Sequence, residues 1–197
     1  MLLGLSYCAF AQKGTPEIAL HQDFRSFQLY PTGEPQRLAA IPLGEAHVLQ
    51  LAFDDLSANT QALNYTWVHC DRNWAASPLL SAEYLNGFME GQLNQGNLSF
   101  NTYQAYSHFS MALPQSNCMP RISGNYYLIL FENDPAEYLV KYPVVIYENA
   151  AGIQSSIHQT APIELSRTHQ EVDALADLSN FSVQNPFEDV QLSIVQN

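Results

Sequence analysis

The 197-residue chain carries a net charge of −12, with 19 acidic and only 7 basic side chains. A nucleic-acid-binding surface requires clustered Lys and Arg, and an anionic membrane surface repels an acidic protein, so this composition argues against both partners. Hydrophobic residues make up 47% of the chain, enough for a buried core, and the 11 Tyr and 10 Phe residues favour β-sheets over long solvated helices.

The first residues have features of an export signal. The apolar run 2–10 overlaps Ala9-Phe10-Ala11, a small-x-small pattern typical of signal-peptide cleavage sites. We therefore predict a partial signal peptide over residues 1–11, with a buried N-terminal strand as the alternative. Cys8 could instead accept a lipid, although Tyr7 precedes it where a small residue is usual. No apolar run in the sequence approaches the roughly 18 residues that a membrane-spanning helix needs.

The strongest strand patterns stand on either side of a turn-rich segment. Around Gln50 and Ala52, apolar side chains occupy every second position, which is the period of a strand with one buried face. Residues 65–70 are β-branched and aromatic, with apolar side chains on both faces, as in a strand at the middle of a sheet. We predict that strands 46–53 and 63–70 form a β-hairpin at the centre of an all-β domain.

Further strands are expected between turns rich in Pro, Gly and Asn. Residues 79–88 have mixed periodicity and predict either a short strand or a helical turn, and residues 90–98 and 114–120 predict loops. The remaining predicted strands are 24–30, 36–41, 106–113, 126–131 and 139–147. Seven or eight short strands over about 130 residues predict an immunoglobulin-like antiparallel β-sandwich domain at 20–148.

A second domain is predicted after the linker-like sequence at 148–152. Its expected strands are 153–158, 169–175, 178–183 and 190–195, with a turn at 185–187. Because these strands are too few to close a sandwich, we expect residues 153–197 to form a truncated second β domain.

Motifs that carry catalytic chemistry are missing from the sequence. It contains no phosphate-binding loop, no His-Glu-x-x-His zinc motif, no Gly-x-Ser-x-Gly and no Cys-x-x-Cys. His69 and Cys70 are neighbours on a predicted strand and point to opposite faces, so they cannot act as base and nucleophile. Asp54 and Asp55 predict a turn cap rather than a metal site. We expect no enzyme activity, metal or cofactor, and whether Cys70 pairs with Cys118 stays open.

The aromatic residues are the remaining candidates for a binding site. Trp74, Tyr84, Phe88 and Tyr103 lie in or beside a long irregular segment between two predicted strands, and such segments frequently carry binding residues. We predict that these four residues bind a partner. Two alternatives remain: the rings fill the core beneath the loops, or Trp67, Trp74, Tyr84 and Tyr103 form a platform for sugar rings.

Several motifs resemble the plug protein family of the type IX secretion system. The runs LAFDDLS at 51–57 and NYTWVHCDRNW at 64–74 carry the resemblance most clearly. It continues at 81–88, 99–103, 106–109 and 123–128, and the start of the family's second region is similar to 168–173 and 185–190.

The resemblance implies a β-rich, non-enzymatic and periplasmic protein associated with the outer membrane. Its partner would be the large translocon β-barrel, whose periplasmic end it would seal, with no nucleic acid or small-molecule substrate. The alternative function from another class is an accessory carbohydrate-binding β-sandwich module.

Overall fold

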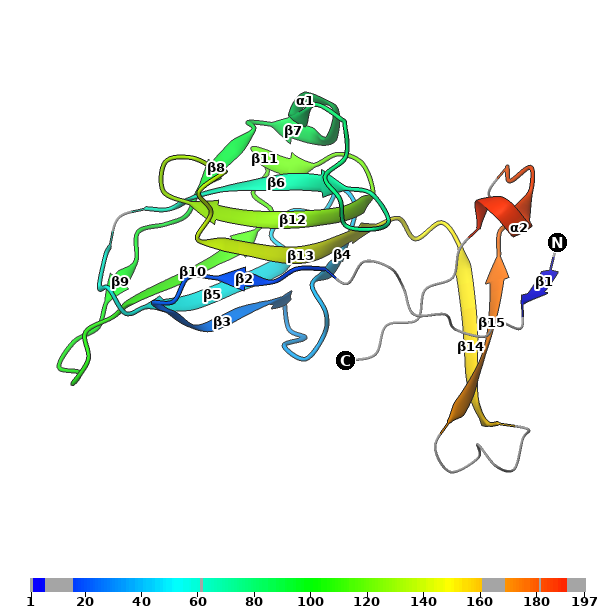
Figure 1. Ribbon diagram of the computed structural model, residues 1–197, viewed down its shortest axis with the longest axis horizontal. Coiled ribbons are helices and arrows are strands. Elements are labelled where there is room, and N and C mark those ends of the chain that lie inside the picture. Colours follow the sequence, from blue (N-terminus) through cyan, green and yellow to red (C-terminus); the bar gives the residue numbers. More distant parts are fainter. Residues whose placement is uncertain (1, 6–15, 61, 161–168, 181, 191–197) are drawn as a thin grey trace. The chain divides into compact units, whose positions relative to one another are not determined.

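The computed structural model describes residues 2–5, 16–60, 62–160, 169–180 and 182–190 (Figure 1). The chain divides into two compact units. The sandwich unit is Gln12–Tyr147, and the hairpin unit combines Met1–Ala11 with Glu148–Asn197. No helix among the described residues is long and apolar enough to cross a membrane.

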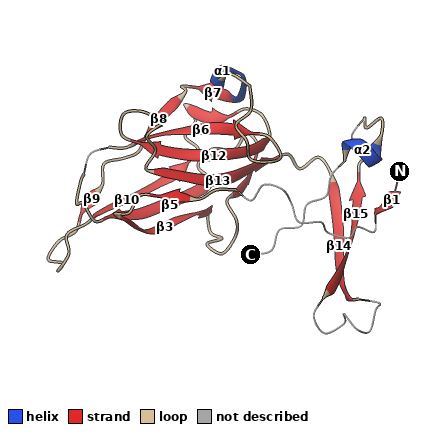
Figure 2. Ribbon diagram, in the orientation of Figure 1, coloured by secondary structure: helices blue, strands red, loops and turns tan. Residues whose placement is uncertain are grey.

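The sandwich unit is built from two main sheets (Figure 2). The first sheet has the order β3-β5-β10-β9, formed by Phe24–Pro31, Leu49–Asp55, Ser107–Leu113 and Asn97–Leu98. The second has the order β2-β13-β12-β6-β8, formed by Ala19–Leu20, Val140–Tyr147, Gly124–Phe131, Asn64–Cys70 and Glu90–Gln92. The short strand β4, Ala40–Pro42, pairs with β13 in parallel.

A smaller layer stands at one end of the second sheet. The helical turn α1, Ser81–Tyr84, leads directly into β7, Leu85–Gly87, and β7 pairs with β11, Cys118–Pro120. Residues 79–88 therefore contain both of the structures between which the sequence could not decide. Strands make up 48% of the structure and helices 4%, so the prediction of an all-β, antiparallel sandwich is confirmed.

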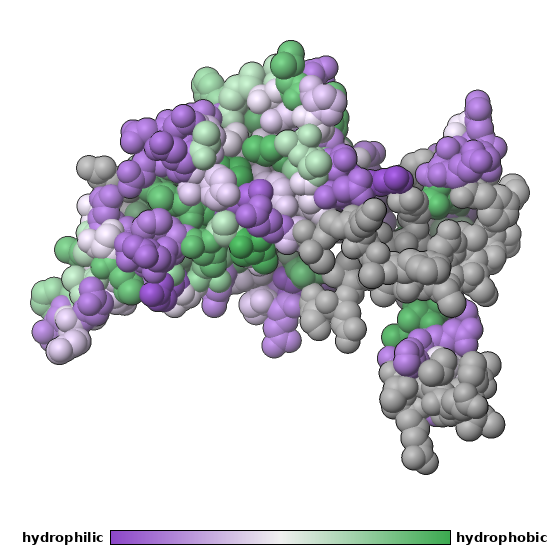
Figure 3. All heavy atoms as spheres, in the orientation of Figure 1, coloured by the Kyte–Doolittle hydropathy of each residue, from purple (hydrophilic) through white to green (hydrophobic). Residues whose placement is uncertain are grey.

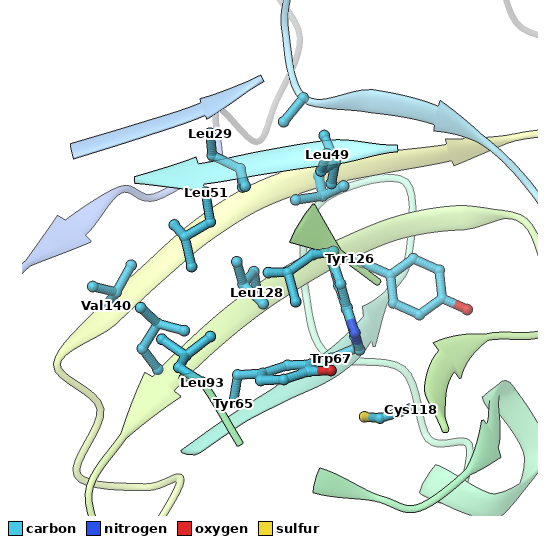
Figure 4. Packing of buried hydrophobic residues seen from close by; sticks show 14 of the residues in the cluster. Leu29, Leu49, Leu51, Tyr65, Trp67, Leu93, Cys118, Tyr126, Leu128 and Val140 are labelled. Carbon is cyan, nitrogen blue, oxygen red and sulfur yellow. The ribbon is translucent and has the colours of Figure 1, made fainter. Parts of the chain in front are cut away.

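The core lies between the two main sheets. The alternation around Gln50 and Ala52 is confirmed, because Leu49, Leu51 and Phe53 are buried while their neighbours are half-buried. From the second sheet, Trp67 and Leu128 pack into the same core as Leu49 and Leu51 (Figure 4). Burial of such side chains supplies the main stabilisation of the sandwich.

The predicted central hairpin is wrong. β5 pairs with β3 and β10 in the first sheet, whereas β6 pairs with β12 and β8 in the second. The intervening segment therefore crosses from one sheet to the other. Alternation shows that a strand has a buried face, but it does not show which strand lies beside it, so two strands facing each other across a core look like a hairpin in sequence.

Several short elements differ from the sequence prediction. Residues 90–98 were expected as a loop and contain β8 and β9, and the loop at 114–120 contains β11. The strand expected at 36–41 is reduced to β4. These strands have two or three residues, too few to show a period. β4, β8 and β9 each pair with a longer strand, whereas β11 pairs with the equally short β7.

The hairpin unit contains one long antiparallel pair. β14, Gly152–Gln159, pairs with β15, Gln170–Asp177, over its full length, and β1, Leu2–Leu5, lies on the other side of β15. The strand predicted at 178–183 is not formed in its described residues, which contain a turn, and the helical turn α2, Pro186–Asp189, stands at the predicted turn. The strand expected at 190–195 lies, except for Val190, outside the described residues.

Candidate partner-binding surface

Tyr84 is buried at the end of the core. It is only 6% exposed, and its ring lies 5.8 Å from the His69 ring and 6.1 Å from the Tyr126 ring, centroid to centroid. Its hydroxyl lies 3.2 Å from Ser81 Oγ, and its carbonyl accepts a hydrogen bond from the Arg121 amide. Tyr84 thus has the position that the core-packing alternative gave it, and it holds α1 against the second sheet.

Trp74 covers the outer face of the second sheet. Its backbone has a left-handed conformation with φ of 64°, in a turn where the Asp71 carboxylate accepts hydrogen bonds from the Asn73 and Ala75 amides. The indole packs on the Tyr127 ring at 5.3 Å, beside a buried cluster that includes Phe131. Trp74 is half-buried, so only part of its ring is available to a partner.

Phe88 is exposed at the connection between β7 and β8. It is 67% exposed, and Leu80 and Met89 nearby in sequence are exposed as well. The backbone of this connection is fixed, because the Phe88 amide donates to the Asn117 carbonyl at 2.6 Å and Gly87 adopts a φ of 87°. Phe88 is therefore an apolar side chain on an ordered backbone, which suits partner binding.

Tyr103 lies in the loop between β9 and β10 and is fully exposed. The same loop exposes Phe100, at 94%, and Leu98 precedes it at the end of β9. The four predicted residues thus have four settings: the core for Tyr84, an outer sheet face for Trp74, and two different connections for Phe88 and Tyr103. The structure does not bring them together as one site.

The sugar-platform alternative does not fit this geometry. A platform requires several exposed rings that are coplanar with the sugar, but Trp67 and Tyr84 are both buried in the core. Only Trp74 and Tyr103 of that set reach the surface.

His69, Cys70 and Asp55 make contacts within the fold. His69 faces the core-side rings of Tyr84 and Tyr126, whereas Cys70 belongs to the cluster on the opposite sheet face, as the alternation predicted. Burial lowers the pKa of His69 and raises the pKa of Cys70 to about 11. Asp55 accepts a hydrogen bond from the Ser57 amide at 2.9 Å, which confirms the predicted turn cap.

Cys70 and Cys118 are free thiols on opposite sides of the second sheet. Cys118 lies in β11 and belongs to the main core, while Cys70 lies in the outer cluster, so the sheet itself separates them. Burial also raises the pKa of Cys118 to about 11. Within the described residues, no group of three or more His, Cys, Asp or Glu side chains could hold a metal ion.

The comparison with protein families is decisive. The model of the type 9 secretion system plug protein 1st domain matches residues 24–148, which is most of the chain and nearly all of the sandwich unit. The chain belongs to this plug protein family. Membership associates the protein with the type 9 secretion system and agrees with the motif resemblance.

A solved structure shares the fold of this plug domain. It is a hypothetical protein from Parabacteroides merdae, with 25% sequence identity and a TM-score of 0.76 over 86% of the present chain. The match covers 43% of that protein, so the plug chain spans less than half of its length. A match to the alkylpurine DNA glycosylase AlkC of Pseudomonas fluorescens, bound to DNA containing an abasic site analog, has 13% identity and a TM-score of 0.33, too low to indicate a shared fold. No curated protein matches the chain.

Sequence reasoning missed two exposed residues of the plug domain. Leu98 ends the segment 90–98 that was expected to be a loop, and Phe100 follows it. Both are exposed, and both are near Tyr103 in the chain. Their hydrophobicity in a Gly- and Asn-rich segment is the signal that could have identified them.

Proposed function

We propose that this plug domain is a non-enzymatic periplasmic component of the type IX secretion machinery that seals the periplasmic end of the outer-membrane translocon barrel. The family match over residues 24–148 is the observation that carries the proposal. The predicted signal peptide at 1–11 supports export to the periplasm. A pore wide enough for folded cargo leaks when idle, and a closing domain prevents this.

The construction of the sandwich supports a sealing role. Its two main sheets enclose a core in which Phe53, Trp67 and Leu128 are almost completely buried. Side chains packed to this degree resist deformation, so the domain would dock as a rigid body with little backbone change. A rigid body of fixed shape is what closing an opening requires.

The exposed aromatic side chains are the proposed contacts with the barrel. Phe88 and Tyr103 are the two exposed aromatic side chains among the predicted residues, and Trp74 is half-buried. Binding hot spots are enriched in Trp and Tyr. Tyr84 would act from beneath, by fixing α1 and the start of β7.

Co-purification with the translocon barrel tests this function. The tagged chain, expressed in a host that has the secretion system, should retain the barrel from detergent-solubilised outer membrane, as identified by mass spectrometry. Phe88→Ala should weaken retention at an unchanged melting temperature, whereas Tyr84→Ala should lower the melting temperature. Recovery of the folded wild-type chain without the barrel would contradict the proposal.

A further inference from the structure

The loop between β9 and β10 presents a small apolar surface at one end of the sandwich unit. Leu98, Phe100 and Tyr103 are 59%, 94% and 110% exposed relative to an unfolded reference. Figure 1 shows the loop extending beyond the strands, and Figure 3 shows hydrophobic residues among hydrophilic ones at this end. Exposed large apolar side chains that gather in one loop mark an interaction site more strongly than scattered ones.

This loop lies in the longest uncharged part of the chain. Residues 91–120 contain no Asp, Glu, Lys or Arg, although charged residues make up 13% of the sequence and the net charge is −12. The histidine in this stretch, His108 in β10, places its Nδ1 2.7 Å from the carboxylate of Asp54, its partner in β5. The loop can therefore enter an uncharged environment without desolvating a charge of its own.

Hydrogen bonds hold the loop in one conformation. The Ser99 amide donates to the Tyr106 carbonyl at 2.8 Å, and the Tyr106 amide donates back to Ser99 Oγ at 3.0 Å. Thr102 Oγ1 lies 2.9 Å from Ser99 Oγ and donates to the Gln104 carbonyl at 2.8 Å. These bonds close the loop at its base and across its middle. Because the loop is already ordered, it loses less conformational entropy when a partner binds.

The base of the loop is packed tightly on the first sheet. A Cβ atom at Gly96 would stand 2.8 Å from the Phe109 ring, so the backbone entering β9 lies directly on that side chain. Gln104 Nε2 reaches the Leu56 carbonyl, at 3.4 Å, in the turn after β5. The backbone that carries Leu98, Phe100 and Tyr103 is thus held against the first sheet.

We propose that residues 98–106 form the docking tip of the plug domain, and that Phe100 and Tyr103 insert into an uncharged, apolar recess on the wall of the translocon barrel. This inference rests on the proposed function and identifies the surface that performs it. The recess must be uncharged, because a charge buried against this loop would find no opposite charge to pair with it. The tip then supplies the central aromatic anchors of the interface.

A lipid bilayer fits the loop less well. Stable binding to a bilayer generally requires two signals, such as an acyl chain together with a basic patch. The loop offers three apolar side chains and no Lys or Arg, on a chain whose acidic charge is repelled by anionic lipid. A loop of fixed conformation can match a protein recess of fixed shape, whereas a fluid bilayer has no fixed shape to match.

The test compares the wild-type chain with the double variant Phe100→Ser/Tyr103→Ser for binding to the purified barrel. The wild type should bind, and the double variant should bind about tenfold more weakly or worse, with an unchanged melting temperature. Leu38→Ser is the matched control, because it removes an apolar side chain that is 54% exposed but lies between β3 and β4. Its binding should equal that of the wild type.

The outcomes separate this inference from the proposed function. If the wild type does not bind the barrel, the proposed function fails and the docking tip fails with it. If the wild type and the double variant bind equally, the docking tip alone is overturned. Equal loss of binding in Leu38→Ser would also overturn it, because the effect would not be specific to the loop.

Two further measurements use the uncharged nature of the loop. Wild-type affinity for the barrel should change little from low to high salt, since the anchoring contacts carry no charge, and a steep loss would assign binding to the acidic surface instead. Vesicles of phosphatidylcholine and phosphatidylethanolamine should not co-sediment the chain. Co-sedimentation that the double variant abolishes would overturn the protein recess in favour of a lipid surface.

Discussion

Two strands of equal length behave in opposite ways in the two units of this chain. β12 and β14 both have eight residues and both form antiparallel pairs, yet the last six residues of β12 are buried and every residue of β14 is exposed. β12 has β13 and β6 on its two sides and the first sheet opposite it. Hydrogen-bonded pairing alone therefore does not bury a strand; a facing layer of side chains does.

Strands with apolar residues on one face occur in both units, as β14 shows. Ile153 and Ile157 stand on one face of β14 opposite Ala176 and Val172 of β15, with Ser155 and Ala174 between them. Both isoleucines are nonetheless exposed. This face is apolar, as in a core, but within the described part of the hairpin unit no other layer covers it.

The largest expected difference between the units comes from removing a large apolar side chain. Leu128→Ala in β12 should lower the free energy of unfolding by about 2–5 kcal/mol, because it leaves a cavity between the main sheets. Ile157→Ala in β14 should change it by less than about 0.5 kcal/mol. Urea unfolding followed by fluorescence measures both. Equal effects would mean that burial does not distinguish the two units.

A matched pair of glycines sharpens the comparison. A Cβ atom at Gly91 in β8 would lie 2.3 Å from the Tyr65 ring, whereas at Gly152 in β14 the nearest atom outside its chain neighbours is 3.5 Å away. Gly91→Ala should therefore cost about 1–3 kcal/mol through overpacking. Gly152→Ala should be tolerated. Thermal unfolding of the two variants checks this, and a tolerated Gly91→Ala would show that β8 does not lie against Tyr65.

The two buried thiols predict a dependence on alkaline pH. Burial raises the pKa of Cys70 and Cys118 to about 11, so the folded state binds these protons more tightly than the unfolded state. Their stabilising contribution is present below about pH 9 and is lost as the pH rises toward 11. Burial raises the pKa of Tyr126 as well, which adds to this loss at higher pH.

Alkylation kinetics isolate the thiols from the tyrosines. At pH 8, iodoacetamide should modify Cys70 and Cys118 slowly in the native chain and rapidly in urea, because both thiols are buried and protonated when folded. Rapid modification of either thiol in the native state would place it at the surface.

The smallest expected effect is that of removing residues 148–197. The boundary near residue 148 is a prediction that the division into two compact units makes specific. A chain ending at Tyr147 should keep the urea midpoint of the sandwich unit and should be more soluble, because the exposed edge and face of β14 are gone. Aggregation of the shortened chain while the longer one stays monodisperse would show that the boundary is misplaced.

The fold was more predictable from sequence than the site. Alternation located β5 and β10, because burial of one face imposes a period that the sequence must show. An apolar run located β12, and stretches between turn residues located β3, β14 and β15 within a few residues. The sequence pattern did not show which strands are neighbours within a sheet. β6 lies opposite β5 rather than beside it, and strands as short as β8 and β9 form only because longer neighbours offer their edges.

The candidate site depended on tertiary contacts that no local pattern records. Tyr84 and Tyr103 are hard to tell apart in sequence, because each is a tyrosine in a segment without a clear strand period. Tyr84 is buried because Tyr126, distant in the chain, stands next to it, whereas Tyr103 is lifted away from the sheets by the hydrogen-bonded loop. Exposure of an aromatic ring is set by such contacts, so the sequence identified both residues and could not separate them.

Electrical conductance of the translocon barrel tests the sealing function most directly. The purified barrel, free of plug, is inserted into a planar lipid bilayer, and the 197-residue chain is added on the periplasmic side. The proposal predicts that the chain closes the pore and lowers the conductance, and that Phe100→Ser/Tyr103→Ser closes it much less. An open pore whose conductance does not change when the folded wild-type chain is present in excess would contradict the account.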